Sequence, residues 1–395
     1  MQSVLKFGGA ALADDVALRR SLGRVQEHLE HSQSRAPVVV VSALAGVTDG
    51  LMTCADQAVD GVSPHATSGA ASHLRIRHRS VLSQLGLSSE LLDRHWRNLC
   101  SLLVGIARQG RLKPANLDLV LSYGERMSAR IFAAALERSG VEATPVDAWD
   151  VGLVSDSNHG QASPVEGIQE LMRQALLAIP GVPVVTGFLA QDRRGQLTTL
   201  GRNGSDLTAS LLAEAIGADE LVFYKDVIGV HSADPRRIAD AFPLGEVSYA
   251  EAAELAFHGS TILHPASVAP AVRAQVPVRL LPLGAHGSQL GTVLVPRMQR
   301  EAPVALACRS QGSVLPELAV PRGWATLALV GHGLAARGEF SARAQSILDA
   351  IGIDTRPIQC AGRLHSLALA VEDENLDGAC QVLHREILLP SLAAV

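Results

Sequence analysis

Short apolar runs that alternate with amphipathic stretches dominate the first three-quarters of the chain. The runs, each four or five residues long, are residues 3–7, 38–41, 182–185 and 221–224. Apolar residues recur at helical spacing over residues 16–29, 87–107, 117–138 and 207–216. Short strands that are apolar on both faces, separated by helices, are typical of a parallel sheet with helices on both sides. The pattern therefore predicts an α/β fold.

Polar residues and glycines follow several of these runs at the point where the strand should end. Gly8 and Gly9 follow the first run, Ser42 follows the second, and Lys225 follows 221–224. Ligands of open α/β sheets gather at the carboxyl ends of the strands. We therefore expect a ligand site there. Thr48, a little beyond Ser42, is either part of that site or a helix N-cap.

The most distinctive stretch is TTLGRNGSD, residues 198–206, directly before the helical run 207–216. Gly201 and Gly204 let the backbone approach a ligand, and Ser205 and Asp206 are favourable helix-cap residues. A helix start also offers unpaired N–H groups and a partial positive charge. This stretch indicates an anion-binding loop, with an ordinary capped turn as the alternative.

The C-terminal quarter has a different order of elements. Further helices are expected at residues 249–257 and 267–273, with closing strands at 277–281 and 292–295, so the first domain is predicted to span residues 1–297. After a strand at 304–308 and an irregular stretch at 311–323, the pattern predicts strands at 325–330, 354–359 and 366–371 and helices at 341–351 and 376–387. That order, βαββα, predicts a smaller α+β domain over residues 298–395.

Composition narrows the classes of function. The 395 residues are 47% hydrophobic with a net charge of −5, which describes an ordinary globular protein and indicates no nucleic-acid partner. The basic stretch 73–79 lacks interleaved aromatic residues and is expected to be a solvated helix face. No apolar run reaches the roughly 18 residues of a membrane span, and the cytoplasm is the expected location. The five cysteines show no C-x-x-C spacing, so no protein metal site or disulfide framework is expected.

Lysine is rare in this chain, and its positions are informative. Only Lys6, Lys113 and Lys225 occur among 34 basic residues, and Lys6 and Lys225 fall at the ends of predicted strands. A compact ammonium group fits between phosphate oxygens in a way that the planar guanidinium of Arg does not. The two positions therefore favour a phosphate-binding role over chance.

Four motifs together resemble the aspartate kinases of the amino acid kinase superfamily. They are KFGG at residues 6–9, GERMS at 124–128, TTLGRNGSD at 198–206 and KDVIGVHSADPR at 225–236. The resemblance covers nearly the whole chain in the order of that family. It implies a three-layer αβα sandwich for residues 1–297 and a single ACT-like domain for 298–395.

The resemblance also implies a role for individual residues. ATP would contact Lys6, Gly8, Gly9, Lys225, Asp226, His231 and Arg236. The amino acid would contact Ser42, Thr48, Glu125, Arg202 and Ser205, with Arg202 on its α-carboxylate and Glu125 on its ammonium group. Asp206 would orient Lys6 or a water molecule on Mg²⁺, the alternative being simple helix capping.

The implied reaction moves the γ-phosphoryl group of ATP onto the β-carboxylate of aspartate. A carboxylate with a pKa of about 3.9 is already ionised at neutral pH and needs no general base. The site must instead supply cations and N–H groups that bridge two anions. This expectation explains why no Ser-His-Asp set is visible in the sequence.

Some residues depart from the family pattern and keep alternatives open. Ala10 and Ala11 replace two hydroxyl residues of the family, His231 stands where tyrosine is frequent, and Thr261 stands where lysine is frequent. A kinase for another small amino acid carboxylate and a catalytically inactive ACT-type sensor are the alternatives. Because only residues 311–323 stand where the family inserts a second ACT module, we expect insensitivity to lysine and threonine. A homodimer or larger assembly is expected.

Overall fold

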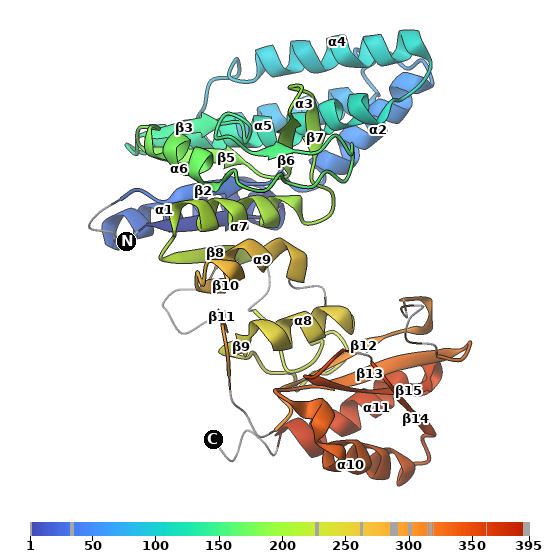
Figure 1. Ribbon diagram of the computed structural model, residues 1–395. Coiled ribbons are helices and arrows are strands. Elements are labelled where there is room, and N and C mark those ends of the chain that lie inside the picture. Colours follow the sequence, from blue (N-terminus) through green and yellow to red (C-terminus); the bar gives the residue numbers. More distant parts are fainter. Residues whose placement is uncertain are drawn as a thin grey trace. The chain divides into compact units, whose positions relative to one another are not determined.

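The structure is a computed structural model in which two compact units are distinguished (Figure 1). It describes residues 2–31, 35–225, 229–260, 264–284, 291–298, 302–313, 315, 318, 320–360 and 362–389. The first unit comprises Met1–Asp226 and Ala266–Ala285, and the second comprises Val227–Pro265 and His286–Val395. Each unit is described by itself.

A parallel sheet forms the centre of the first unit. Its strands follow the order β3-β5-β2-β1-β8-β10. Their bounds are Ser3–Phe7 (β1), Val38–Val41 (β2), Ala143–Val146 (β3), Val182–Thr186 (β5), Glu220–Lys225 (β8) and Val278–Pro282 (β10). Lys6 of β1 is in register with Val40 of β2 and Phe223 of β8. The predicted β-branched runs are therefore the central strands, and their carboxyl ends share one edge.

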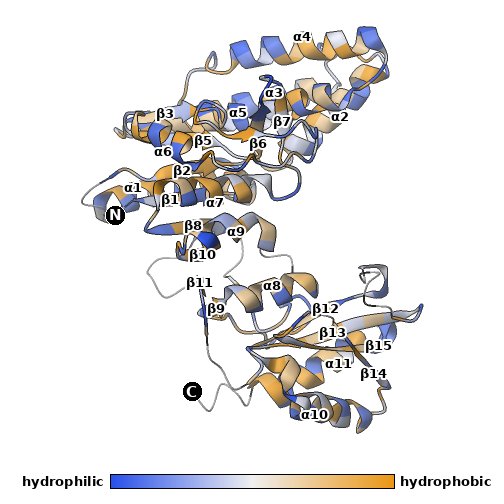
Figure 2. Cartoon of the chain, viewed as in Figure 1, coloured by the Kyte–Doolittle hydropathy of each residue, from blue (hydrophilic) through white to orange (hydrophobic). Residues whose placement is uncertain are grey.

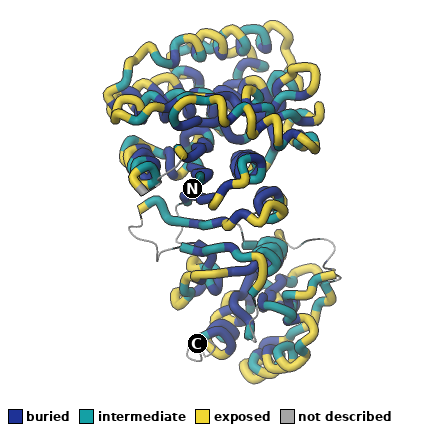
Figure 3. Tube along the Cα trace, turned by 60° about the vertical axis from the view of Figure 1, so that its left-hand side comes forward, coloured by how far each residue is buried: buried dark blue, intermediate teal, exposed yellow. Residues whose placement is uncertain are grey.

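Helices cover both faces of this sheet. Leu5 and Phe7 point to one face, where their core cluster includes side chains of α1 (Asp15–His31) and α5 (Pro114–Arg138). Lys6, between them, points to the opposite face, where α7 (Gly204–Ile216) contacts β1 and β8. Strand residues are buried, and several helices show one apolar and one polar side (Figures 2 and 3).

The remaining elements of the first unit pack around this core. Helices α2 (Val47–Val59), α3 (Ala70–Gln84) and α4 (Asp93–Gln109) gather beside α5, α6 (Gln169–Leu177) packs on α7, and α9 spans Pro265–Arg273. A small sheet is formed by β4 (Val154–Ser155), β6 (Leu189–Asp192) and β7 (Leu197–Thr199). The sequence patterns did not predict this small sheet, which leads directly into the loop at 200–204.

An antiparallel sheet forms the core of the second unit. Its order is β12-β13-β15-β14, with bounds Ala305–Arg309, Trp324–Val330, Ser366–Glu372 and Thr355–Ile358. Leu348 of α10 (Gly338–Asp349) and Leu383 of α11 (Leu376–Leu383) belong to one apolar cluster with Leu327 and Leu369 of the sheet. The predicted βαββα order is present as β13-α10-β14-β15-α11.

A segment that precedes this sheet in the sequence belongs to the same unit. Helix α8 (Tyr249–Phe257) contacts β12 and β13, and β9 (Glu246–Ser248) pairs in parallel with β11 (Thr292–Val295). The two compact units thus divide the chain at other positions than the boundary predicted near residue 297. The predicted division, a catalytic domain followed by an ACT-like domain, remains a prediction about sequence modules.

The predicted fold class is confirmed, with local corrections. The helix expected from residue 87 begins at Asp93, because residues 85–92 form turns after α3. In the basic stretch, His73, Arg75 and Arg79 are exposed as expected, but His78 is fully buried, with its ring edge against Trp96. Within the irregular stretch at 311–323, a 3₁₀ turn covers Gln311–Ser313, Leu318 also has a 3₁₀ conformation, and several other positions lie outside the described residues.

Candidate active site

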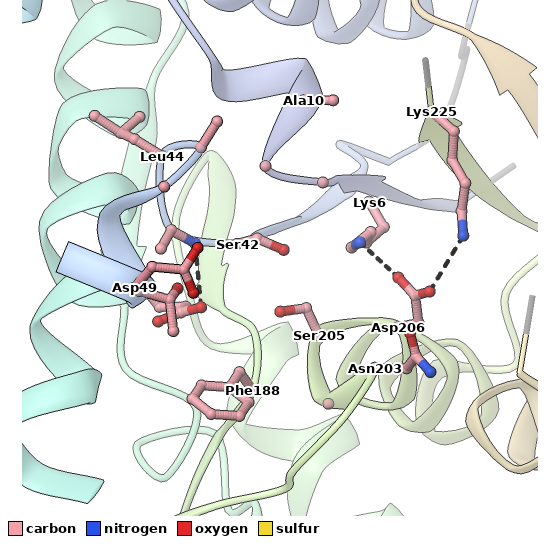
Figure 4. Close-up of a pocket in the computed structure, with 18 of the residues that line it drawn as sticks. Lys6, Ala10, Ser42, Leu44, Asp49, Phe188, Asn203, Ser205, Asp206 and Lys225 are labelled. Atoms are coloured by element: carbon pink, nitrogen blue, oxygen red, sulfur yellow. Dashed lines mark hydrogen bonds and ion pairs between the residues drawn. The ribbon is translucent and has the colours of Figure 1, made fainter. Parts of the chain in front are cut away.

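A cavity of about 460 Å³ opens at the carboxyl edge of the parallel sheet (Figure 4). It is lined by the end of β1 and the turn after it, the loop that joins β2 to α2, the start of α7, Glu125, Phe188, Tyr224 and Lys225. All these segments belong to the first unit. Sequence segments that are more than 200 residues apart therefore meet at the edge where the strand pattern predicted a ligand site.

Two lysines share one buried carboxylate at the floor of this cavity. The Nζ atom of Lys6 lies 2.5 Å from Oδ1 of Asp206, and the Nζ atom of Lys225 lies 3.4 Å from Oδ2 (Figure 4). Burial alone would raise the pKa of Asp206, but the two ammonium groups outweigh burial and lower this pKa below its usual value. The ionised carboxylate neutralises one of the two positive charges. The trio therefore keeps a net positive charge, as an anion site requires.

The first turn of α7 completes the positive end of the cavity. The helix begins at Gly204, and its N-cap residue Asn203 has a left-handed backbone conformation (φ 59°) without a side-chain cap. Ser205 and Asp206 are therefore helical residues, and their predicted role as helix caps is wrong. The N–H of Gly204 donates to the carbonyl oxygen of Gly201 at 3.0 Å, and the N–H groups of the next residues, which no side chain of the N-cap residue accepts, can face an anion in the cavity.

Close packing explains why glycine is needed at several points of the wall. A Cβ atom on Gly187 would lie 2.5 Å from Cβ of Ser205, and one on Gly204 would lie 2.9 Å from the Phe188 ring. Gly8 follows β1 at the point where a Cβ would lie 3.3 Å from Nζ of Lys6. Any larger residue at Gly187 would push the first turn of α7 away from the sheet.

Glu125 is a buried carboxyl group that also lines the cavity. It projects from α5, is only 3% exposed, and accepts a hydrogen bond from the backbone N–H of Ala43 at 3.1 Å. Its Oε2 atom is buried and has no hydrogen-bond partner among the described residues. Burial raises the pKa of Glu125 to about 8, although the Ala43 N–H and the charge of Lys6 oppose this shift. A cationic ligand group beside Oε2 would provide the missing partner.

Most residues that the sequence motifs singled out meet in this cavity. Its lining includes Lys6, Gly8, Gly9, Ser42, Thr48, Glu125, Ser205, Asp206 and Lys225. Arg202 is exposed on the loop before α7 and is not part of the lining. Asp226 and Thr261 lie outside the described residues.

His231 and Arg236, also expected at the nucleotide, belong to the second unit and have local partners there. The Nδ1 atom of His231 lies 3.1 Å from the carbonyl oxygen of Gly229, and the guanidinium of Arg236 pairs with Asp234 at 2.9 Å. Their roles remain predictions.

Several lining residues were not predicted from the sequence. They include Asp49, Phe188, Asn203 and Tyr224. Phe188 and Asn203 both have positive φ angles, 69° and 59°, which is uncommon for residues other than glycine. Strand β5 ends at Thr186, and Phe188 lies two residues later. Its position just beyond a predicted strand could therefore have indicated that it lines the ligand site.

The sequence profile of the amino acid kinase family matches residues 1–282. The chain belongs to the amino acid kinase family.

In the part of the chain that the structure describes, no helix is both long and apolar enough to cross a membrane, and no three His, Cys, Asp or Glu side chains gather as a metal-binding group.

Individual members of this family are similar over the same region. Chloroplastic aspartokinase 3 of Arabidopsis thaliana is 35% identical over 283 residues, which cover 70% of this chain and 50% of that protein. Lysine-sensitive aspartokinase 3 of Escherichia coli is 35% identical over 282 residues, covering 70% of this chain and 60% of that protein. The chain thus spans about half to three-fifths of the length of these curated relatives.

Solved structures are also similar over nearly the whole chain, among them the following one. Escherichia coli aspartokinase III in complex with aspartate and ADP superposes with a TM-score of 0.79 and 26% identity, covering 98% of this chain and 99% of that one.

Proposed function

We propose that this chain is an ATP-dependent kinase that phosphorylates the β-carboxylate of L-aspartate, giving 4-phospho-L-aspartate. The observation that carries the proposal is the Lys6–Asp206–Lys225 trio, which shares one cavity with Glu125, whose Oε2 atom has no hydrogen-bond partner among the described residues. A positively charged group and a buried carboxyl group that line one cavity match a substrate pair made of a triphosphate and an amino acid. The similarity to aspartokinases supports the same choice.

The transferring phosphoryl group is expected beside Lys6. Asp206 holds this ammonium group in place through the 2.5 Å ion pair, while Lys225 lies on the other oxygen of the same carboxylate. The approach of a carboxylate to a triphosphate is opposed by charge repulsion, and fixed ammonium and N–H groups reduce that repulsion most at the transition state. Gly8 and Gly9 leave room for the nucleotide phosphates to reach the backbone.

The amino acid is expected at the Glu125 side of the cavity. Its ammonium group would pair with Oε2 of Glu125, and Ser42, Thr48 and Ser205 supply hydroxyl groups in the lining of the same cavity. Arg202, at the rim, would reach the α-carboxylate. Together, a carboxylate and a guanidinium would select for an α-amino acid.

The residues present also fit Mg²⁺ carried by the nucleotide. Mg²⁺ in kinase sites is usually held by phosphates, water and one or two carboxylates, so a dedicated protein cluster is not needed. Asp206 is the buried carboxylate placed to contact such an ion or one of its waters. When bound, Mg²⁺ would neutralise phosphate charge during transfer.

Nucleotide contacts from Asp226, His231 and Arg236, a homodimeric or larger assembly and a cytoplasmic location complete the proposal. We further propose that lysine and threonine do not inhibit the enzyme, because the second ACT module is reduced to the stretch at 311–323. An effector without a pocket has no differential affinity through which to shift activity.

The proposal is tested by coupled measurement of ADP release with a panel of acceptors: aspartate, glutamate, asparagine, N-acetylaspartate and no acceptor. We expect release with aspartate alone, and loss of it in Asp206→Ala. Glu170→Ala, which removes an exposed ion pair with Arg173, is the matched control and should retain full activity. If another acceptor gives faster ADP release than aspartate, that acceptor is the substrate and the assignment of aspartate is wrong. Absence of release with every acceptor, in a protein that still binds ligands through its second unit, would support the inactive-sensor alternative.

A further inference from the structure

Asp118 is a buried carboxylate outside the cavity whose contacts are all made to the segments that support the cavity loop. It lies on α5, seven residues before Glu125, and is 1% exposed. One oxygen, Oδ1, accepts a hydrogen bond from Oγ1 of Thr199 at 2.7 Å. The other, Oδ2, lies 2.8 Å from Nδ1 of His159 and accepts the Gly160 N–H at 3.1 Å. Because an ionised carboxylate can only accept, its contact with His159 requires the form of the ring that carries a proton on Nδ1.

The two segments that Asp118 joins are far apart in the sequence and also contact each other. Thr199 is the last residue of β7, and its carbonyl accepts the N–H of Ala162 at 2.8 Å. Oγ1 of the preceding Thr198 lies 2.7 Å from the hydroxyl of Ser155. Asp118 therefore closes a polar junction between the buried end of β7 and the more exposed turn formed by residues 158–161.

This junction carries the loop that forms one wall of the cavity. Gly201 has a φ of 71°, and a Cβ atom added to it would lie 3.2 Å from the carbonyl oxygen of Gly160. The loop thus rests on the turn that Asp118 holds. Two residues further on, Asn203 lines the cavity and Gly204 begins α7. A shift at the junction would reach the cavity wall within two or three residues.

We propose that Asp118 is a positioning residue for the amino acid substrate: by fixing Thr199 and the turn at Gly160, it holds loop 200–204 in the conformation that forms the substrate side of the cavity. The reading of the loop as the amino acid side rests on the proposed function. Asp118 itself does not line the cavity and contacts no substrate.

The test is the isosteric substitution Asp118→Asn. An amide keeps one acceptor oxygen but presents an NH₂ group to donors that had faced the second oxygen, so the junction cannot be fully satisfied. We expect the KM for aspartate to rise about tenfold, with kcat within threefold and the KM for ATP unchanged, because the loop carries Arg202, the proposed contact of the amino acid α-carboxylate. Thr199→Val, which removes a single donor, should shift the KM for aspartate in the same direction by a smaller factor.

Ser122→Ala is the matched control on the same helix. Ser122 is fully buried and donates to the carbonyl oxygen of Leu119 at 2.7 Å, so its loss perturbs α5 without touching the junction. All variants are compared well below their melting temperatures. A KM for aspartate that is unchanged in Asp118→Asn, or that rises equally in Ser122→Ala, would overturn the proposal, as would equal changes in both KM values.

Amide hydrogen exchange over residues 199–205 separates this proposal from the proposed function. In the free protein, Asp118→Asn and Thr199→Val should exchange faster there than wild type, while Ser122→Ala should not. If the wild-type protein phosphorylates no amino acid but this exchange pattern is found, the proposed function fails and the positioning of the loop stands. If exchange is the same in all four proteins, the positioning role is refuted whatever the activity.

Discussion

The unusual state of Glu125 leads to a quantitative prediction about pH. The proposed partner of this group is the ammonium of the amino acid, which requires the ionised carboxylate. Burial raises the pKa of Glu125 to about 8, so most molecules of the free protein carry the protonated form at neutral pH. Substrate binding should therefore require loss of a proton from Glu125.

The size of the effect follows from the titration of a single group. With a pKa of about 8, roughly 3% of molecules are ionised at pH 6.5 and roughly 76% at pH 8.5. We therefore expect kcat/KM for aspartate to rise about 25-fold between these values. The value of kcat should rise much less, because the bound ammonium favours the ionised form. Asp206 does not contribute to this rise, because its pKa is lowered below its usual value and it stays ionised throughout.

The assay is coupled ADP release at saturating ATP, repeated with doubled coupling enzymes at each pH. Glu125→Gln removes the titration while keeping the size of the side chain. Its kcat/KM for aspartate should be flat within about threefold and, at pH 8.5, about 10- to 100-fold below wild type, the usual worth of a hydrogen bond to a charged group. A flat wild-type profile, or a rise of the same size in Glu125→Gln, would refute the assignment of the ammonium to Glu125.

Four further outcomes are expected. Lys6→Ala and Asp206→Ala should each lower kcat by about 10²–10³ with the fold intact on circular dichroism, since each removes a fixed charge near the phosphoryl group; more than a tenth of wild-type kcat would disprove the role of that residue. Arg202→Ala should mainly raise the KM for aspartate, and an unchanged KM would move the α-carboxylate contact elsewhere. Lysine and threonine, alone and together at millimolar concentration and subsaturating aspartate, should inhibit less than twofold; stronger inhibition that aspartate does not overcome would show an effector pocket. His78 is buried and uncharged, and burial lowers its pKa to about 4, so unfolding takes up a proton below about pH 6.5. This residue alone should make the free energy of unfolding fall by about 3 kcal/mol as the pH falls from 6.5 to 4, and His78→Asn should show a shallower fall in denaturant titrations.

The first-unit sheet could be predicted from the sequence because its strands are buried on both faces. Short runs such as Val38–Val41 contain only β-branched apolar residues and lack the polar positions of an amphipathic helix. The observed strand has the predicted bounds. The carboxyl-edge rule then placed Lys6, Ser42 and Lys225 at one cavity. The small sheet of β4, β6 and β7 was missed because its strands are only two to four residues long and mix polar with apolar residues.

Features that depend on tertiary contacts could not be read from local patterns. Asp118 sits in a helical stretch as an ordinary acidic residue, and only the fold brings Thr199 and Gly160 to it. The same holds for His78, which is buried against Trp96 although its basic neighbours in the sequence indicated a solvated helix face. The capping role expected of Ser205 is wrong because the N-cap is Asn203, which is in a left-handed conformation, and the helix begins at Gly204, two residues before the start that an N-cap at Ser205 would give.

Trapping of the product with hydroxylamine tests the central claim most directly. Hydroxylamine attacks the acyl carbon of an acyl phosphate, releases phosphate and leaves a hydroxamate at that carboxyl group. Mass spectrometry then identifies which carboxyl group of aspartate has reacted. We predict ATP-dependent formation of the β-hydroxamate by the wild-type protein and none by Asp206→Ala. ATP turnover with aspartate but without any hydroxamate, or with the α-hydroxamate alone, would contradict transfer to the β-carboxylate.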